Sequence, residues 1–330
     1  MPGPLAVSLG DPAGIGPEIV AKAWAARGAR SLPPFFAIGD PQSVARVWSG
    51  PVAVIDSPEA AAHVFDRALP VLVIESEDTI VPGQPDPAGA RCALRSLELA
   101  VDLTISGAVA ALVTGPVSKA QLYAIGFRHP GQTEFVADRC GVATADAVMM
   151  LAGPGLRVVP MTTHVPLHEV PALLTEELIV TKVRATLHGL RTLFGIDRPR
   201  LALAGLNPHA GENGAIGREE IAVMIPAVEN LRAEGIGIAG PLAADTMFHP
   251  RARARYDAAL CAYHDQALVP LKTLFFDDGV NITLGLPIVR TSPDHGTAFA
   301  LAGRNEAEPG AMIAAIAMAA ETSARRAAAS

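Results

Sequence analysis

The chain has 330 residues, of which 50% are apolar, and its 26 Lys and Arg against 33 Asp and Glu give a formal net charge of −7. This length and apolar content suit two domains or one large α/β domain, and they exclude wholesale disorder. The acidic balance, without a long basic run, argues against a nucleic-acid-binding protein.

The sequence shows no targeting or membrane-spanning pattern. Residues 1–4 lead directly into an apolar segment, without the basic region and apolar stretch of a signal peptide. The three cysteines, Cys92, Cys140 and Cys261, are far apart and form no CxxC motif. We therefore expect free thiols, no disulfide framework and no cysteine zinc site. These features predict a cytoplasmic protein that does not bind membranes.

Short apolar runs alternate with longer amphipathic segments along the chain. The apolar runs predict strands at residues 5–9, 35–38, 71–74, 110–113, 158–161, 201–204 and 258–262. The amphipathic segments predict helices over residues 17–29, 87–106, 176–193, 218–234 and 306–328. This alternation is typical of βαβ units around a largely parallel sheet. Because the sequence has no flexible linker, two domains would be joined by a chain that crosses between them twice.

One glycine-rich motif resembles a dinucleotide-binding loop but lies in the wrong context. Residues 235–240 fit G-x-G-x-x-G, yet that fingerprint requires a strand before it and a helix after it. Here a predicted helix precedes the motif and Pro241 follows it. We therefore expect a helix C-cap and a turn.

Two other loops follow predicted strands and have the composition of anion-binding turns. Residues 10–18 (GDPAGIGPE) open a helix, so their backbone N–H groups either bind an anion or form a tight turn. Residues 114–119 (TGPVSK) place Lys119 in a first helical turn, where the helix dipole disfavours a cation. That unfavourable position favours a role for Lys119 with a ligand.

Three of the nine histidines share one setting. His164, His209 and His264 each lie just past the end of an apolar run. Open α/β sheets bind ligands at the carboxyl ends of their strands. Three neutral imidazoles that converge there suit a divalent cation such as Zn²⁺.

Polar residues cluster toward the C-terminal part of the chain. Lys272, Asn281 and Arg290 alternate with apolar segments. Their hydrogen-bond donors suit a phosphate or a carboxylate, and the alternative is three solvated side chains. Asp245 and Asp265 are candidate general bases or partners of the histidines.

Taken in order, these motifs resemble those of the 4-hydroxythreonine-4-phosphate dehydrogenase family of vitamin B6 biosynthesis. The matching segments, which together span nearly the whole chain, are residues 10–18, 114–119, 131–135, 162–167, 207–212, 244–248, 263–272 and 291–298. The resemblance implies an α/β fold like that of isocitrate and isopropylmalate dehydrogenases, with two α/β domains and a cleft between them. The expected domains are residues 1–125 plus 275–330, and residues 126–274, the second carrying much of a homodimer interface.

The resemblance also implies roles for individual residues. His164, His209 and His264 match metal ligands, with His264 expected from the partner subunit of an active site that the homodimer shares. The positions expected to bind substrate are Gln132, Thr133, Lys272, Asn281 and Arg290.

Gln132 departs from the pattern, because the family usually has histidine there. Glutamine forms hydrogen bonds but carries neither a proton nor a positive charge. If the usual histidine assists proton transfer, another group such as His129 must act in its place.

The activity implied is NAD- or NADP-dependent oxidation of the secondary hydroxyl of 4-phosphooxy-L-threonine, aided by one divalent cation (Zn, Mg or Co). The β-keto acid product, 2-amino-3-oxo-4-phosphooxybutanoate, then loses CO₂ to give 3-amino-2-oxopropyl phosphate. Asp245, Lys119 and Asp265 are the candidates for the general base.

Three alternatives stay open at the level of sequence. The first is a related dehydrogenase that acts on erythronate- or threonate-4-phosphate. The second is a non-catalytic protein that binds phosphorylated metabolites. The third is a metallohydrolase, which the phosphate-binding residues fit less well.

Overall fold

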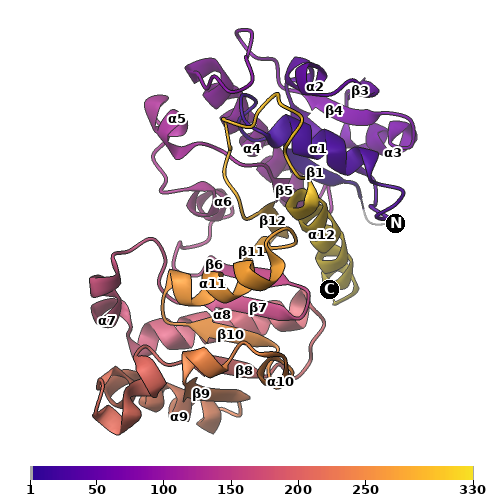
Figure 1. Cartoon of the computed structure of the whole chain (residues 1–330). Coiled ribbons are helices and arrows are strands. Elements are labelled where there is room, and N and C mark those ends of the chain that lie inside the picture. The colour runs from indigo at the N-terminus through magenta and orange to yellow at the C-terminus, as the bar shows by residue number, and fades with distance from the viewer. Residues whose placement is uncertain (1–2, 330) are drawn as a thin grey trace. The chain divides into compact units, whose positions relative to one another are not determined.

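The computed structural model describes residues 3–329. Met1, Pro2 and Ser330 lie outside the described residues, so the expected absence of a signal peptide concerns a segment whose first two residues are not described. The chain divides into two compact units (Figure 1). Unit 1 comprises the residues up to Thr144 together with those from Leu286 onward, and unit 2 comprises Ala145–Gly285.

Unit 1 is built on parallel strands. Their order is β3 (Val52–Ile55), β4 (Leu69–Val73), β2 (Phe35–Gly39), β1 (Leu5–Ser8), β5 (Ala111–Thr114) and β12 (Arg290–Pro293). Every neighbouring pair in this order is parallel. The strands β1, β2 and β5 are buried at every position, as expected where helices cover both faces of a sheet.

Helices follow the strands of unit 1 in βαβ fashion. They are α1 (Gly16–Ala25), α2 (Pro41–Val47), α3 (Ala61–Val64), α4 (Pro87–Ile105), α5 (Lys119–Ala124), α6 (Gln132–Arg139) and α12 (Gly310–Ala329). Asp40 and Asp86 cap α2 and α4 by accepting hydrogen bonds from backbone N–H groups of the first turn. The C-terminal helix α12 packs against β12, β5 and α1, beside elements from the start of the chain (Figure 1).

Unit 2 combines parallel and antiparallel strands. Their order is β11 (Val280–Leu284), β6 (Val148–Gly153), β7 (Leu156–Pro160), β10 (Ala258–Cys261), β8 (Leu201–Ala204) and β9 (Ile238–Leu242). The strands from β7 to β9 are parallel, whereas β6 is antiparallel to both β7 and β11. The carboxyl ends of β7, β10 and β8 therefore lie at one edge, and the three predicted metal ligands follow them in the sequence.

Unit 2 has five α-helices among its described residues, of which α8, α9 and α11 pack on its strands. The five are α7 (Val170–Leu173), α8 (Glu176–Thr192), α9 (Ile225–Ala233), α10 (Pro250–Arg253) and α11 (His264–Phe275), with a π-helical turn, Glu220–Met224, before α9. The buried residues Leu151, Val158, Ala259 and Met247 belong to one apolar cluster of this unit. In the part of the chain that is described, every helix is too short or too polar to cross a membrane.

The predicted α/β class and the largely parallel strand arrangement are confirmed. All of the predicted strands and long helices are present, with ends that differ by a few residues. The sequence pattern did not predict β3, β6, β9, β11 and β12 or the short helices. Residues 235–240 form the expected C-cap: Ile236 N donates to Leu231 O and Gly235 has φ +85°, and β9 then begins within the motif.

The unit boundaries lie further along the chain than the expected domain boundaries at 125/126 and 274/275. Helix α6 belongs to unit 1 because Gln132 Nε2 donates to Gly115 O and Arg139 forms an ion pair with Asp102. Strand β11 stays with unit 2 because it pairs with β6 along its whole length. The assignment of a dimer interface to residues 126–274 stays a prediction.

The cysteines carry no disulfide within residues 3–329, as expected. Cys92 and Cys261 are buried, and burial raises the pKa of the Cys92 thiol to about 11. Such thiols are inert at neutral pH.

Candidate active site

Two of the three predicted histidine ligands lie side by side in unit 2. The ring centroids of His164 and His264 are 5.6 Å apart. Hydrogen bonds continue the pairing of β7 and β10 beyond both strands, since Met161 N and Thr162 N donate to Cys261 O and Ala262 O. This extension brings the two loops together. Both rings line a cavity of about 280 Å³, whose other lining residues include Thr162, Tyr263 and Asp265.

Carboxylates orient two of the imidazoles. His264 Nδ1 lies 2.7 Å from Asp265 Oδ1, and His209 Nδ1 lies 2.9 Å from Glu212 Oε2. A carboxylate accepts a hydrogen bond from Nδ1–H, which leaves the lone pair of Nε2 available for a metal ion. Asp265 is therefore placed to orient His264.

His209 lies in a turn of unusual backbone conformation. Five consecutive residues, 209–213, are left-handed, with φ between 45° and 79°. Only Gly211 among them is a glycine, and each of the others costs roughly 1–2 kcal/mol in this conformation. His164 is also left-handed, with φ 54°. Such strain collects at functional sites and persists where surrounding contacts hold it.

The convergence of all three histidines stays a prediction. His209 is not a lining residue of the cavity that holds His164 and His264. Within residues 3–329 of a single chain, no group of three or more His, Cys, Asp or Glu side chains is arranged to hold a metal ion. The donor chemistry nevertheless fits a divalent metal, because imidazoles oriented by carboxylates are typical zinc or cobalt ligands. Mg²⁺ prefers oxygen ligands, so this set fits it less well.

Arg290 is a buried charged residue of unit 1. Its side chain is buried at the start of β12, where Nε and Nη2 donate to Thr114 Oγ1 over 3.2 and 2.7 Å and Nη1 donates to Thr133 Oγ1 over 3.2 Å. Burial lowers the pKa of Arg290 to about 10, while the nearby Glu134 carboxylate acts in the opposite direction. An anionic ligand would stabilise this buried guanidinium by charge-assisted hydrogen bonds.

Gln132 lies at the start of α6, beside Thr133. Its Nε2 donates to Gly115 O over 3.2 Å, whereas Oε1 is buried with no hydrogen-bond partner. This orientation offers a ligand an acceptor, and it therefore suits an ammonium or a hydroxyl group better than a phosphate. Lys119 is exposed at the start of α5, and its Nζ lies 3.5 Å from the position of a Cβ added to Gly131. Gln132, Thr133 and Lys119 thus belong to one neighbourhood of unit 1.

His129, the suggested replacement for the missing histidine, packs against aromatic rings. Its ring centroid is 5.3 Å from the centroids of both Phe127 and Phe135. Its Nε2 lies 3.9 Å from Asp138 Oδ2. These contacts give His129 a packing role in unit 1.

The remaining predicted residues belong to unit 2. Lys272 lies on α11 and Asn281 on β11, where the buried Oδ1 of Asn281 has no hydrogen-bond partner. Asp245 is exposed on a short 3-10 turn, Ala244–Thr246, that follows β9. The unpaired amide oxygen of Asn281 is consistent with a ligand that supplies a hydrogen-bond donor.

The loop at residues 10–18 is a tight turn. The amide groups of residues 11, 13, 14 and 15 donate to Pro116 O, Asp11 Oδ1, Asp11 O and Thr297 O. A Cβ on Gly10 would lie 2.2 Å from Pro116 O, and one on Gly16 would lie 1.9 Å from Leu9 O. Because these amides are already used within unit 1, they do not form an anion cradle. Burial raises the pKa of Asp11 to about 6.

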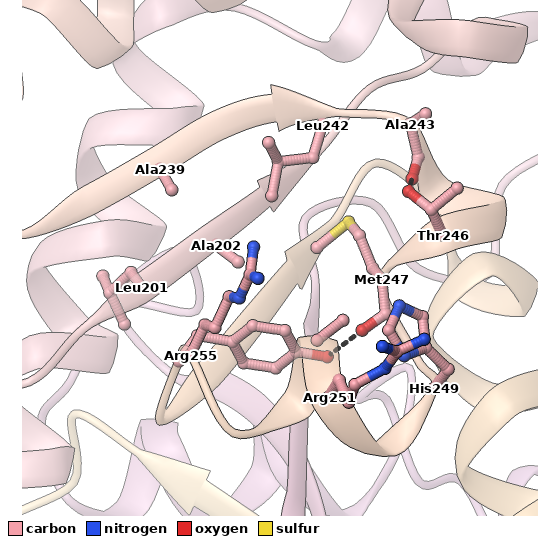
Figure 2. Close-up of a pocket in the computed structure, with 12 residues that line it drawn as sticks. Leu201, Ala202, Ala239, Leu242, Ala243, Thr246, Met247, His249, Arg251 and Arg255 are labelled. Carbon is pink, nitrogen blue, oxygen red and sulfur yellow. Dashed lines mark hydrogen bonds between the residues drawn. The ribbon is translucent and has the colours of Figure 1, made fainter.

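A larger hollow of unit 2, about 450 Å³, contains none of the predicted site residues. It lies over β8 and β9, with Leu201, Ala202 and Met247 on its apolar floor and Arg251 and Arg255 among its exposed lining residues (Figure 2). The buried Tyr256 hydroxyl donates to Met247 O over 2.9 Å. Its polar group is thus satisfied internally, and the hollow is separate from the His164–His264 cavity.

The sequence did not reveal the roles of Thr114 and Glu212 in the candidate site. The position of Thr114 at the end of a strand was predictable, but its bond to Arg290 depends on the pairing of β12 with β5. The Glu212 carboxylate, three residues after His209, could have been recognised as a partner of that histidine.

The comparisons with known proteins find relatives that are similar over almost the whole chain. A family described as "Pyridoxal phosphate biosynthetic protein PdxA" matches residues 32–319. A 4-hydroxythreonine-4-phosphate dehydrogenase from Zymomonas mobilis is 60% identical over 323 residues, which cover 98% of this chain and 96% of the relative.

Solved structures show the same similarity. The crystal structure of 4-hydroxythreonine-4-phosphate dehydrogenase from Klebsiella pneumoniae matches with a TM-score of 0.87 and 38% identity, covering 98% of each chain. Isocitrate dehydrogenase from Methylococcus capsulatus matches with a TM-score of 0.50 and 15% identity, over 99% of this chain and 87% of that one, which shows a shared fold alone. The expected relation to the isocitrate dehydrogenase fold is therefore confirmed, and the chain belongs to the PdxA family of pyridoxal phosphate biosynthetic proteins.

Proposed function

We propose that this chain is an NAD- or NADP-dependent 4-hydroxythreonine-4-phosphate dehydrogenase. The observation that carries the proposal is the 60% identity, along almost the whole chain, to a relative of that name. The reaction removes a hydride from the carbon that bears the secondary hydroxyl and a proton from its oxygen. The nicotinamide accepts the hydride. The β-keto acid formed then loses CO₂ to give 3-amino-2-oxopropyl phosphate.

The residues of unit 1 bind the anionic part of the substrate. Arg290 donates charge-assisted hydrogen bonds to a phosphate or carboxylate, and Thr133 aligns the guanidinium through its hydroxyl. The buried and unpaired Oε1 of Gln132 accepts from the substrate's ammonium or hydroxyl group. Gln132 thus contributes to binding and orientation, and it does not transfer a proton.

The residues of unit 2 act at the reacting hydroxyl. His164, His209 and His264 would hold a divalent cation, which would lower the pKa of the substrate hydroxyl and stabilise negative charge on its oxygen. Asp265 keeps Nδ1 of His264 protonated and so orients that ring. Because this bond occupies Asp265, Asp245 and Lys119 are the better candidates for removing the hydroxyl proton. Lys272 and Asn281 complete the substrate-binding set with an ammonium and an amide.

We further propose that the chain works as a homodimer whose subunits share the active site. Apolar side chains exposed on unit 2 support this proposal, among them Leu167 (64% exposed), Val269 (62%) and Phe276 (76%). Light scattering on the purified protein is expected to give twice the mass of one chain.

The function is tested by a panel of substrates with metal-reconstituted enzyme. The panel contains 4-phosphooxy-L-threonine, erythronate-4-phosphate and threonate-4-phosphate, each with NAD and with NADP. We expect reduced cofactor and CO₂ to appear fastest with 4-phosphooxy-L-threonine. Faster turnover of a sugar-acid phosphate would assign the enzyme to that substrate, and tight binding without any reduced cofactor would indicate a binding protein.

A further inference from the structure

We infer that Glu220 is a positioning residue of the active site: its buried carboxylate, acting through Asn207, holds the turn that carries His209. This inference rests on the proposed function, because it takes His209 to be a metal ligand. It concerns a side chain that precedes α9 and lies outside every motif used to recognise the family.

Glu220 bonds to both polar groups at the start of the turn. Its side chain is 1% exposed, and Oε1 accepts from Asn207 N over 2.8 Å while Oε2 accepts from Asn207 Nδ2 over 2.9 Å. Glu219 Oε2 accepts from the same Nδ2 over 2.8 Å. Two adjacent carboxylates thus bind one asparagine, which precedes His209 by two residues.

The turn needs such an anchor because its own backbone conformation is unfavourable. L-residues disfavour left-handed φ values, yet residues 209–213 adopt five of them in succession. Backbone hydrogen bonds that involve the turn include Ala210 N to Asn207 O and Ile216 N to Gly211 O. Bonds to a buried carboxylate supply a fixed point from outside the turn, and they set the direction in which the His209 ring leaves the backbone.

Three glycines make room for the Glu220–Asn207 pair. A Cβ on Gly211 would lie 2.6 Å from Glu220 Oε2, and one on Gly205 would lie 3.2 Å from Glu220 Oε1. A Cβ on Gly217 would lie 2.2 Å from Asn207 Nδ2. The backbone therefore closes around this pair from three sides, so that the carboxylate has little freedom to move.

The helix at Glu220 is itself irregular. The segment Glu220–Met224 is a π-helical turn, a feature frequent at functional sites. In a regular α-helix, consecutive side chains point about 100° apart. Here Glu219 and Glu220 both reach Asn207, which is consistent with a helix start that is adapted to hold the histidine turn.

The experiment measures metal binding directly. Full-length protein is stripped of metal and titrated with Co²⁺, whose visible absorption reports both the affinity and the ligand geometry. We compare the wild type with Glu220→Gln, which replaces an acceptor by a donor that faces Asn207 Nδ2. Glu229→Gln, the same substitution at an exposed position of α9, serves as the matched control. His209→Ala tests the ligand itself.

We expect Glu220→Gln to remain folded by circular dichroism and to bind Co²⁺ about 10- to 100-fold more weakly, the range typical of residues that support metal ligands. Its visible spectrum should also change, whereas Glu229→Gln should match the wild type. A Glu220→Gln protein with unchanged affinity and spectrum, when His209→Ala has lost its Co²⁺ binding, would overturn this inference alone. Unchanged binding in His209→Ala would overturn the proposed metal site instead.

A second variant covers the case in which Glu220→Gln does not fold. Asn207→Ala removes the side-chain bonds and keeps the backbone bond to Glu220, and we expect the same loss of Co²⁺ affinity. If both variants unfold, the pair serves the stability of unit 2 as a whole, and the assignment of Glu220 as a positioning residue is refuted.

Discussion

Replacement of Arg290 by methionine should separate substrate binding from stability. The side chain is buried between two threonine hydroxyls, and burial lowers its pKa from an ordinary value of 12.5 to about 10. That difference corresponds to a cost of about 3 kcal/mol for burying the charge. The cation is present in folded and unfolded protein below pH 10, so the whole cost applies at neutral pH and is relieved only as the pH rises through about 10.

Methionine removes this cost and also removes the hydrogen bonds to Thr114 and Thr133. Those bonds are worth about 1 kcal/mol each, so the two effects nearly cancel. We expect the free energy of unfolding of Arg290→Met to change by less than about 2 kcal/mol. Substrate binding loses charge-assisted bonds worth about 2–4 kcal/mol in total, which corresponds to a rise in KM of roughly 30- to 800-fold.

The assay follows NADH or NADPH formation over a range of substrate concentrations, together with urea unfolding of the ligand-free protein. Arg325→Met is the control, because Arg325 is exposed on α12 and forms an ion pair with Glu321. A KM for Arg290→Met within threefold of the wild type would refute its role in binding. A loss of more than about 4 kcal/mol of stability would show that the guanidinium serves the fold.

Three further outcomes are expected. Treatment with a chelator should abolish activity. In a metal titration of activity, Zn²⁺ or Co²⁺ should restore it at lower concentrations than Mg²⁺ does. Preferential rescue by Mg²⁺ would contradict a metal site made of imidazoles. Gln132→Met should raise KM about tenfold, because it removes a buried acceptor that has no partner, and it should lower the melting temperature slightly, because it also removes the bond to Gly115 O. An unchanged KM would place Gln132 outside the site. Burial raises the pKa of Asp11 from 3.8 to about 6, so the folded protein binds more protons than the unfolded protein between these values and loses stability as the pH rises. Asp11→Asn should therefore be more stable than the wild type at pH 8, by up to about 3 kcal/mol in urea unfolding, and an advantage that persists at pH 4 would disprove this account.

Elements of the fold were predictable where a short stretch of sequence determines the secondary structure by itself. The strands β1, β2, β5 and β10 are short apolar runs buried on both faces, and such runs stand out in the sequence. The strand β9 was hidden because its sequence, IAGPL, contains glycine and proline. The strand β12, RTSP, is polar although every residue in it is buried, and its pairing with β5 depends on residues far away in the sequence.

In the candidate site, too, the features set by local sequence were predictable and those set by distant residues were not. The position of each histidine after an apolar run was visible in the sequence, and the adjacency of His164 and His264 follows from the pairing of β7 and β10. The left-handed turn at His209 could not be predicted, because its conformation depends on the Glu220 carboxylate and on backbone packing around glycines. Likewise, burial of Arg290 beside Thr114 required knowledge of the neighbouring strand.

The insertion of unit 2 within unit 1 sets an order of events during biosynthesis. All of unit 2, Ala145–Gly285, leaves the ribosome before the residues of β12 and α12 emerge from it. Until then β5 is an edge strand that lacks its neighbour, and unpaired edges invite pairing with other chains. Because Arg290 is the first residue of β12, the arginine proposed to bind the substrate's anionic group emerges together with the segment that closes this edge. A nascent or truncated chain that ends before residue 290 would therefore lack the binding group and carry an exposed, aggregation-prone strand.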